Sequence, residues 1–158
     1  MKGSAAAALI SVVSIPSVAQ GGLPGPIAVA DHVALNAADS EASADFYRRA
    51  FGMTDVPTAL PNTRWLNMGN GMTLHIIGGR TAAVSSNRIV HFALRTDDLA
   101  KSIDYFDASG IAWFDFMGKP RTIQTRFDGV RQIFAQDPDG YWVEISDKRG
   151  EVQASKFR

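Results

Sequence analysis

The stretch His32-Val-Ala-Leu-Asn-Ala-Ala-Asp39 returns in altered form as His91-Phe-Ala-Leu-Arg-Thr-Asp-Asp98. Each copy is followed, at the same spacing, by a serine, an aspartate and two adjacent aromatic residues, within 43–47 and 102–106. The two copies are offset by about 59 residues, and a fixed offset over several positions is typical of a duplicated unit. The sequence therefore predicts two similar halves.

A second pair of segments repeats in the same order. Gly71 and Leu74-His-Ile76 correspond to Gly140 and Val143-Glu-Ile145, with an offset of about 69 residues. The larger offset indicates an insertion of roughly ten residues in the second half, before its last strands. The stretch 113–128 is the candidate for that insertion.

Within each half the pattern predicts a strand, a helix and then hairpin strands. Segments 29–36 and 89–95 are rich in apolar and β-branched residues that alternate with period two, as strands do. Aspartate and serine side chains are the usual N-caps of helices, and a glycine often follows the last helical residue. The candidates are Asp39 or Ser40 for the first helix, and Asp97 or Asp98 with a terminating Gly110 for the second.

Four residues of the repeat lie on the polar faces of their predicted strands. Successive side chains on a strand point to opposite sides, so the apolar neighbours of each of these residues lie on the other face of its strand. The apolar face can be buried under a helix, which leaves the polar face to line a shared cavity. All three histidines of the chain occur in this set, which comprises His32, His75, His91 and Glu144.

These residue types predict a site for one divalent metal ion. Neutral imidazole and carboxylate are good ligands for zinc, nickel, iron(II), manganese or cobalt. The chain has no cysteine, so thiolate ligands and disulfides are excluded. A single histidine on a strand is more often a hydrogen-bonded core residue than a ligand, but the repeat-related placement of all four favours a metal centre.

The composition is typical of one globular domain, and its charge balance favours a small molecule over a polyanion as the partner. Apolar residues make up 46% of the 158 residues and charged residues 20%, which is typical of a folded domain of ordinary size. Sixteen basic residues balance sixteen acidic ones, so no global field attracts nucleic acid or an anionic membrane. We therefore expect neither nucleic acid nor membrane as a partner.

At these residues the chain resembles the vicinal oxygen chelate superfamily, which includes glyoxalase I, bleomycin-resistance proteins, fosfomycin-resistance enzymes and type I extradiol dioxygenases. The resemblance covers roughly 28–147. Its motifs are His32-Val-Ala-Leu with Phe46-Tyr47 and Phe51-Gly52, His91-Phe-Ala-Leu, and Asp137-Pro-Asp-Gly-Tyr-Trp-Val-Glu-Ile145, of which the last is the most specific.

The resemblance implies an α+β fold of two tandem βαβββ modules. They would form an open, cupped mixed sheet around the metal, with helices on the outer face. The expected domain is 28–148, with module one at 28–79 and module two at 88–148, followed by a tail at 149–158. Superfamily members build this cup either within one chain or by exchanging modules in a homodimer, and the linker does not decide between the two.

The resemblance also implies a ligand set and a reaction class. His32, His91 and Glu144 match ligand positions, and His75 occupies the fourth, more variable one, which is usually glutamate in glyoxalase I. The best interpretation is a glyoxalase-like lyase or isomerase, in which Glu144 and His75 move protons on an oxygen-chelating substrate. The alternatives are an iron(II)-dependent extradiol-type dioxygenase and a non-catalytic protein that binds a drug or metabolite.

Five further residues are candidates for substrate binding. Three share strand parity with the cavity face of the second half, Arg95 lies two residues beyond His91, and Arg121 belongs to the inserted stretch. That stretch mixes aromatic and basic residues and is either a substrate lid that recognises an anion or a solvated loop. The five candidates are Trp142, Phe134, Gln132, Arg95 and Arg121.

The N-terminal residues resemble an export signal. Lys2 precedes an apolar stretch at 5–15, Pro16 breaks it, and Ser17-Val-Ala19 offers the small residues that a signal peptidase recognises. We expect cleavage after Ala19, a flexible leader at 20–27, and a periplasmic or secreted product. The alternative is an alanine-rich tail that is not a signal.

Overall fold

A computed structural model describes residues 28–85 and 87–147. The expected signal peptide at 1–19, the leader at 20–27 and the tail at 149–158 lie outside these residues. In the described ranges no helix is both long and apolar enough to cross a membrane.

The first module contains one helix and a four-stranded sheet of order β1-β4-β3-β2. Strand β1 runs parallel to β4, and the other neighbours are antiparallel. The elements are β1 (His32–Ala37), α1 (Ser40–Phe51), β2 (Thr54–Val56), β3 (Thr63–Gly69) and β4 (Met72–Gly78).

The second module repeats this plan and adds one strand. Its order is β5-β9-β8-β6, and β7 also pairs with β8, so the inserted stretch extends the outer edge of the sheet. The elements are β5 (His91–Arg95), α2 (Leu99–Ala108), β6 (Trp113–Phe114), β7 (Gln124–Thr125), β8 (Arg131–Gln136) and β9 (Trp142–Ser146). The predicted α+β class with open, mixed sheets is confirmed.

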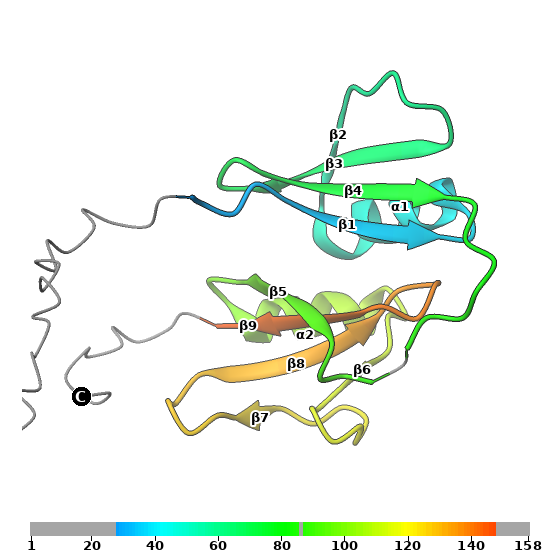
Figure 1. Ribbon diagram of the computed structural model, residues 1–158. Helices are drawn as coiled ribbons and strands as arrows, with labels where there is room; N and C mark the ends of the chain where they lie inside the picture. Colours follow the sequence, from blue (N-terminus) through cyan, green and yellow to red (C-terminus); the bar gives the residue numbers. More distant parts are fainter. Residues whose placement is uncertain (1–27, 86, 148–158) are drawn as a thin grey trace, which may run out of the picture.

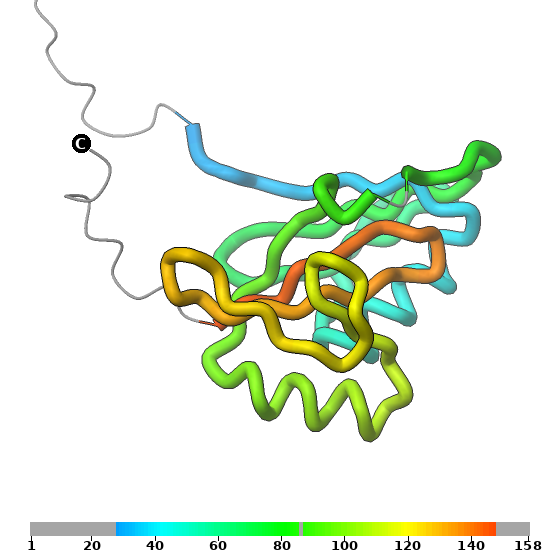
Figure 2. The backbone as a smooth tube through the Cα atoms, turned by 90° about the horizontal axis from the view of Figure 1, so that it is seen from below, coloured from blue at the N-terminus to red at the C-terminus, as the bar shows by residue number. Residues whose placement is uncertain are grey.

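The two sheets lie next to each other with β1 and β5 as their inner strands (Figure 1). Among the described residues no β-ladder joins them, so the protein has two separate sheets instead of one continuous sheet. Figure 2 shows the same arrangement from below, with α1 and α2 on the same side of the two sheets.

Side-chain caps fix the two helices at the expected places. Asp39 accepts hydrogen bonds from the backbone amides of Glu41 (2.9 Å) and Ala42 (3.2 Å), which satisfies amide groups that a helix start leaves free. Asp98 accepts from the amide of Lys101 in the same way at 3.1 Å. Asp39 and Asp98, not Ser40 and Asp97, are therefore the N-caps, and Gly110 follows the second helix with φ 68°.

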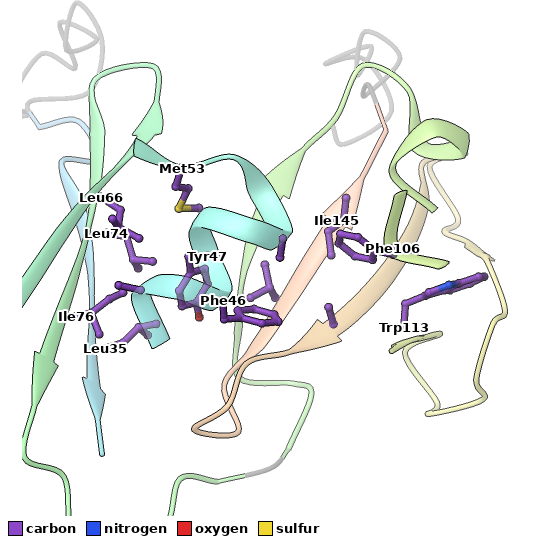
Figure 3. Packing of buried hydrophobic residues seen from close by; sticks show 14 of the residues in the cluster. Leu35, Phe46, Tyr47, Met53, Leu66, Leu74, Ile76, Phe106, Trp113 and Ile145 are labelled. Carbon is purple, nitrogen blue, oxygen red and sulfur yellow. The ribbon is translucent and has the colours of Figure 1, made fainter. Parts of the chain in front are cut away.

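The core forms where α1 covers the first sheet and reaches the second module. Figure 3 shows α1 between the strands of the first sheet and those of the second. Tyr47 is fully buried, and its ring lies 6.1 Å from that of Phe92 on β5. Phe51 at the end of α1 meets Phe106 of α2 edge to face, at 5.8 Å. Helix α1 thus packs against both modules instead of covering only its own sheet.

The turn between β8 and β9 joins the modules through buried carboxylates. Asp139 accepts hydrogen bonds from the amide of Ala38 (2.7 Å) and the hydroxyl of Ser43, and it pairs with Arg80 at 2.6 Å. Burial raises the pKa of Asp139, but these hydrogen bonds outweigh burial, so the pKa lies below its usual value. The carboxylate is therefore ionised and holds the second module against the start of α1.

The other aspartate of this turn, Asp137, accepts a hydrogen bond from the middle of α1. The hydroxyl of Tyr47 donates to Asp137 Oδ2 at 2.8 Å. Burial raises the pKa of Asp137, although the hydrogen bond from Tyr47 acts to lower it. Burial, followed by the charge of Asp137, raises the pKa of Tyr47 as well. The most specific motif of the sequence therefore serves, in part, as the joint between modules.

Candidate metal centre

The first sheet brings His32 and His75 together on the face turned away from α1. Their rings stack at 4.3 Å between centroids, with 11° between planes. The indole of Trp65 stacks on the other side of His75 at 4.2 Å and 9°. Three parallel rings from β1, β4 and β3 therefore stand side by side on a sheet face that neither described helix covers.

Each imidazole of this first pair has a hydrogen-bond partner close by in sequence. His32 Nδ1 lies 2.8 Å from Asp31 Oδ2. A carboxylate oxygen accepts, so Nδ1 carries a hydrogen, and in the neutral ring Nε2 is then the nitrogen available to a metal. His75 Nε2 lies 3.0 Å from the hydroxyl of Thr73. Burial, followed by the charge of His32, lowers the pKa of His75, which favours the neutral form that can bind a metal.

The second sheet brings His91 and Glu144 together. His91 Nδ1 lies 2.6 Å from the carbonyl oxygen of Arg88, which can only accept, so Nδ1 carries the hydrogen. The other ring nitrogen, Nε2, then faces Glu144 Oε2 at 3.1 Å. A neutral imidazole would place a lone pair against a carboxylate there, and a cation between the two atoms would satisfy both. The donor set therefore fits a metal ion.

Glu144 is the most enclosed of the four candidate ligands. Its side chain is 8% exposed, against 44% for that of His32. Phe134 lies opposite it on β8, and the ring of Phe116 from the inserted stretch meets Phe134 at 5.7 Å. The inserted stretch thus reaches over the second pair.

A cation accompanies the buried carboxylate. Arg126 lies 3.5 Å from Glu144 Oε1 and 2.7 Å from Asp128 Oδ2. Glu144 therefore presents one oxygen to His91 and the other to Arg126. The sequence contains a signal for Arg126, which shares strand parity with Gln124 if 124–126 is extended, but the residue predicted from the insertion is Arg121.

The four predicted ligands form two pairs in one chain, one on each sheet. In residues 28–85 and 87–147 no group of three or more histidine, cysteine, aspartate or glutamate side chains is close enough to hold a metal ion. The structure thus brings together His32 with His75, and His91 with Glu144, but does not unite the two pairs within a chain. We call them the first and second half-sites.

Three of the predicted substrate residues share the face of Glu144. Phe134 lies directly opposite Glu144, and Gln132 and Trp142 occupy the same face by register. Gln132 is 5% exposed; its amide nitrogen donates to Gln124 at 3.1 Å, while its carbonyl oxygen has no hydrogen-bond partner among the described residues. Trp142 lies beneath the guanidinium of Arg88, at 4.0 Å.

The two predicted arginines differ in position. Arg95 is exposed at the end of β5, on the same face as His91. Arg121 instead binds both oxygens of Asp107, at 2.5 and 2.7 Å, and lies over Trp113, on the helix side of the sheet. Trp113 and Phe114 point to opposite faces, so Arg121 lies across the sheet from Glu144.

The comparisons assign the family. The model of the Glyoxalase/Bleomycin resistance protein/Dioxygenase superfamily matches residues 29–145, and the chain belongs to this superfamily. A search of curated proteins gives no match. The predicted resemblance is confirmed, and with it an α+β fold whose members include many enzymes and typically bind a divalent metal.

Solved structures share the fold at low sequence identity. A glyoxalase family protein from Bacillus anthracis has a TM-score of 0.64 at 19% identity, covering 80% of this chain and 99% of its own. Lactoylglutathione lyase from Agrobacterium tumefaciens has a TM-score of 0.60 at 23% identity, and the match covers 78% of this chain and 96% of the lyase. Oxidase ChaP-H2 has a TM-score of 0.60 at 21% identity, and the match covers 78% of this chain and 95% of the oxidase. Such identities establish the fold and leave the reaction open.

Proposed function

We propose that the protein is a metal-dependent, glyoxalase-like lyase or isomerase acting on a small substrate with neighbouring oxygen atoms. The observation that carries this proposal is the second half-site, where His91 Nε2 and Glu144 Oε2 face each other at 3.1 Å with the hydrogen of His91 already committed to Arg88. In the neutral form of His91 these two atoms are both acceptors, and a shared cation would stabilise them.

We further propose that two copies of the chain complete the centre, the first half-site of one copy meeting the second half-site of the other. The first half-site lies on a sheet face with exposed Ala34 and Asn36 beside the stacked rings. A two-fold dimer would build two equivalent centres. Each would have His32 and His75 from one copy and His91 and Glu144 from the other.

The residues around such a centre suit proton transfer on a bound substrate. The metal would supply Lewis-acid stabilisation of the negative charge that develops on a chelated substrate oxygen. Glu144, enclosed against Phe134, would accept a proton from substrate carbon and return it, with His75 as the second group of this kind. Gln132, Phe134 and Trp142 would orient the substrate, and the enclosing inserted stretch would exclude water.

A second candidate is iron(II)-dependent dioxygenation of the extradiol type. The observation that favours it is the donor set itself, because two imidazoles and one carboxylate are the ligands of many non-haem iron(II) oxygenases. His32, His91 and Glu144 would be the ligands, and His75 would act as the base.

The experiment is metal analysis followed by activity screens. The purified, full-length protein is stripped with a chelator and titrated with zinc, nickel, iron(II), manganese and cobalt, and each loaded form is screened on 2-oxoaldehyde adducts and on catechols, with and without oxygen. Turnover without oxygen supports the lyase or isomerase, and oxygen uptake with iron(II) supports the dioxygenase. Tight binding of a compound recovered unchanged would identify a non-catalytic binding protein, and no binding of any metal would contradict the proposal.

We also propose export through the N-terminal segment. The supporting feature is the order of Lys2, the apolar stretch 5–15 and Ser17-Val-Ala19. N-terminal sequencing of the mature protein should begin at Gln20, and an intact Met1 would contradict export.

A further inference from the structure

A cleft of about 1420 Å³ opens between the two modules, away from the half-sites. One wall consists of the end of α1 and the turn between β3 and β4, and the other of β5 and the start of α2. Val33 and Phe92 line it, and by strand parity these residues point to the opposite face from His32 and His91. Arg95, which shares the parity of His91, reaches the cleft at the last position of β5. None of the four candidate metal ligands lines this cleft.

Large apolar side chains line the cleft without closing it. Phe51, Met68, Phe92 and Leu94 pack against the hydrophobic core yet are only half-buried. Three of the five methionines of the chain line it as well: Met53, Met68 and Met72. Methionine is flexible and adapts to ligands of varied shape, so the lining suits an apolar body of drug size.

The rim carries two arginines that lack the partners that the other described arginines have. Arg49 and Arg95 both line the cleft, one from each module, and both are exposed. Neither has a carboxylate or ring partner among the described residues. Elsewhere Arg88 stacks on Trp142, and the ion-paired arginines are Arg48, Arg64, Arg80, Arg121, Arg126 and Arg131.

The acidic residues at the rim leave this charge largely uncompensated. Asp98 caps α2 and pairs with Lys101 at 3.5 Å, and Asp97 has an interaction of its own. Guanidinium groups form strong, often bidentate, hydrogen bonds with carboxylates. An anionic head at the rim, with an apolar body below it, matches both parts of the cleft.

We propose that the cleft between the modules is a second binding site, which takes an amphipathic carboxylate. The carboxylate binds Arg49 and Arg95, and the apolar body lies against Phe92 and the three methionines. Such a ligand contacts both modules, so it fixes their relative position and raises the thermal stability of the folded chain. This site is independent of the metal.

The test uses decanoate as the probe, with a chelator present so that metal binding plays no part. The full-length protein carries ¹³C-methyl methionine, and its methyl NMR signals are followed during the titration. The signals of Met53, Met68 and Met72 should shift and saturate. Met117 should not, because it is 80% exposed in the inserted stretch outside the cleft. Decanol should bind at least tenfold more weakly than decanoate.

Variants separate the charge from the apolar lining. The double variant Arg49→Gln/Arg95→Gln should weaken decanoate at least tenfold, whereas Lys119→Gln/Arg131→Gln, which removes the same charge outside the cleft, should change it less than twofold. Met72→Trp, which fills the cleft, should abolish the shifts of Met53 and Met68 while circular dichroism stays unchanged.

Four results would overturn the proposal. They are the absence of saturable shifts, equal shifts at Met117, equal affinity for decanol, and methionine shifts that depend on protein concentration without decanoate. The last result would mean that a second copy of the chain fills the cleft.

Discussion

The two half-sites come from the same repeat, yet their surroundings differ. In the first, His32 is 44% exposed and stacks in a row of rings on an open sheet face. In the second, Glu144 is 8% exposed, and residues of the inserted stretch lie around it. The repeat conserves the placement of the ligands, and the insertion changes their accessibility.

The comparison indicates a division of work between the modules. A buried carboxylate with a fixed imidazole holds a cation firmly, because few waters compete for it. An exposed pair of imidazoles gains a defined environment only when another surface covers it. In the proposed centre, the first half-site is therefore the one that a second copy would have to cover, whereas the geometry of the second is already set within the chain.

The largest effect is expected from breaking the preorganised half-site. Glu144→Gln removes the only carboxylate among the four candidate ligands, so metal affinity should fall roughly 1000-fold, about 4 kcal/mol. Calorimetric titration with zinc measures this. Asp147→Asn, which changes a carboxylate at the end of the same sheet, is the control and should leave affinity unchanged; an equal loss in both variants would refute a specific role for Glu144.

A second prediction contrasts the packing of the two faces. Phe134 is fully buried under the inserted stretch, so Phe134→Ala should lower the free energy of unfolding by about 3 kcal/mol. Trp65 is half-buried on the first sheet's open face, so Trp65→Ala should lower the free energy of unfolding by only about 1 kcal/mol. Urea denaturation of both variants checks the order, and similar losses would show that the first face is covered as well.

A third prediction concerns the joint that holds the two half-sites in one molecule. The pKa of Asp139 is below its usual value in the folded chain, so the carboxylate stabilises the fold above its unfolded pKa of about 3.9. That stability is lost as pH falls through the lower, folded pKa. Asp139→Asn should therefore cost about 2 kcal/mol at pH 7.

The difference between this variant and the wild type should shrink steadily below pH 4. Unfolding curves at pH 7, 5, 4 and 3 measure it. A difference that does not depend on pH would mean that the ionised form of Asp139 contributes nothing to the joint.

The smallest effect is expected at the outer partner of the first half-site. Asp31 orients His32 through a hydrogen bond of 2.8 Å, but its side chain is 84% exposed. Asp31→Asn should weaken metal binding about tenfold, the lower end for loss of an outer-shell partner. Calorimetry again measures it, with Asp45→Asn as an exposed control; a loss as large as that of Glu144→Gln would reverse the ranking of the half-sites.

The sequence predicted the fold because the repeat marks both modules and the alternation marks the faces. The α+β class, the caps at Asp39 and Asp98 and the pairing of His91 with Glu144 all follow from local patterns. The separation of the half-sites does not, because it depends on how α1 packs between modules through Tyr47 and Phe51.

The positions of the arginine side chains within the inserted stretch were equally hard to predict. Arg121 was expected at the substrate, but Asp107 and Trp113 hold it on the helix side of the sheet. Arg126 lies beside Glu144 instead. Both outcomes depend on the two short strands that the insertion forms, and strands of two residues leave almost no periodic signal.

The most direct test of the central claim, that half-sites of two copies build one metal centre, is a mixing experiment. Zinc binding is first measured for the His75→Gln variant and the Glu144→Gln variant separately. The two variants are then mixed in equal amounts, refolded together and measured again. Either variant alone should bind zinc more weakly than the wild-type chain, because every centre then lacks one of its four ligands. In the mixture, half of the dimers should pair one copy of each variant and contain one intact centre, about one ion per four chains. Failure of the mixture to bind any zinc that the separate variants do not bind would contradict the claim.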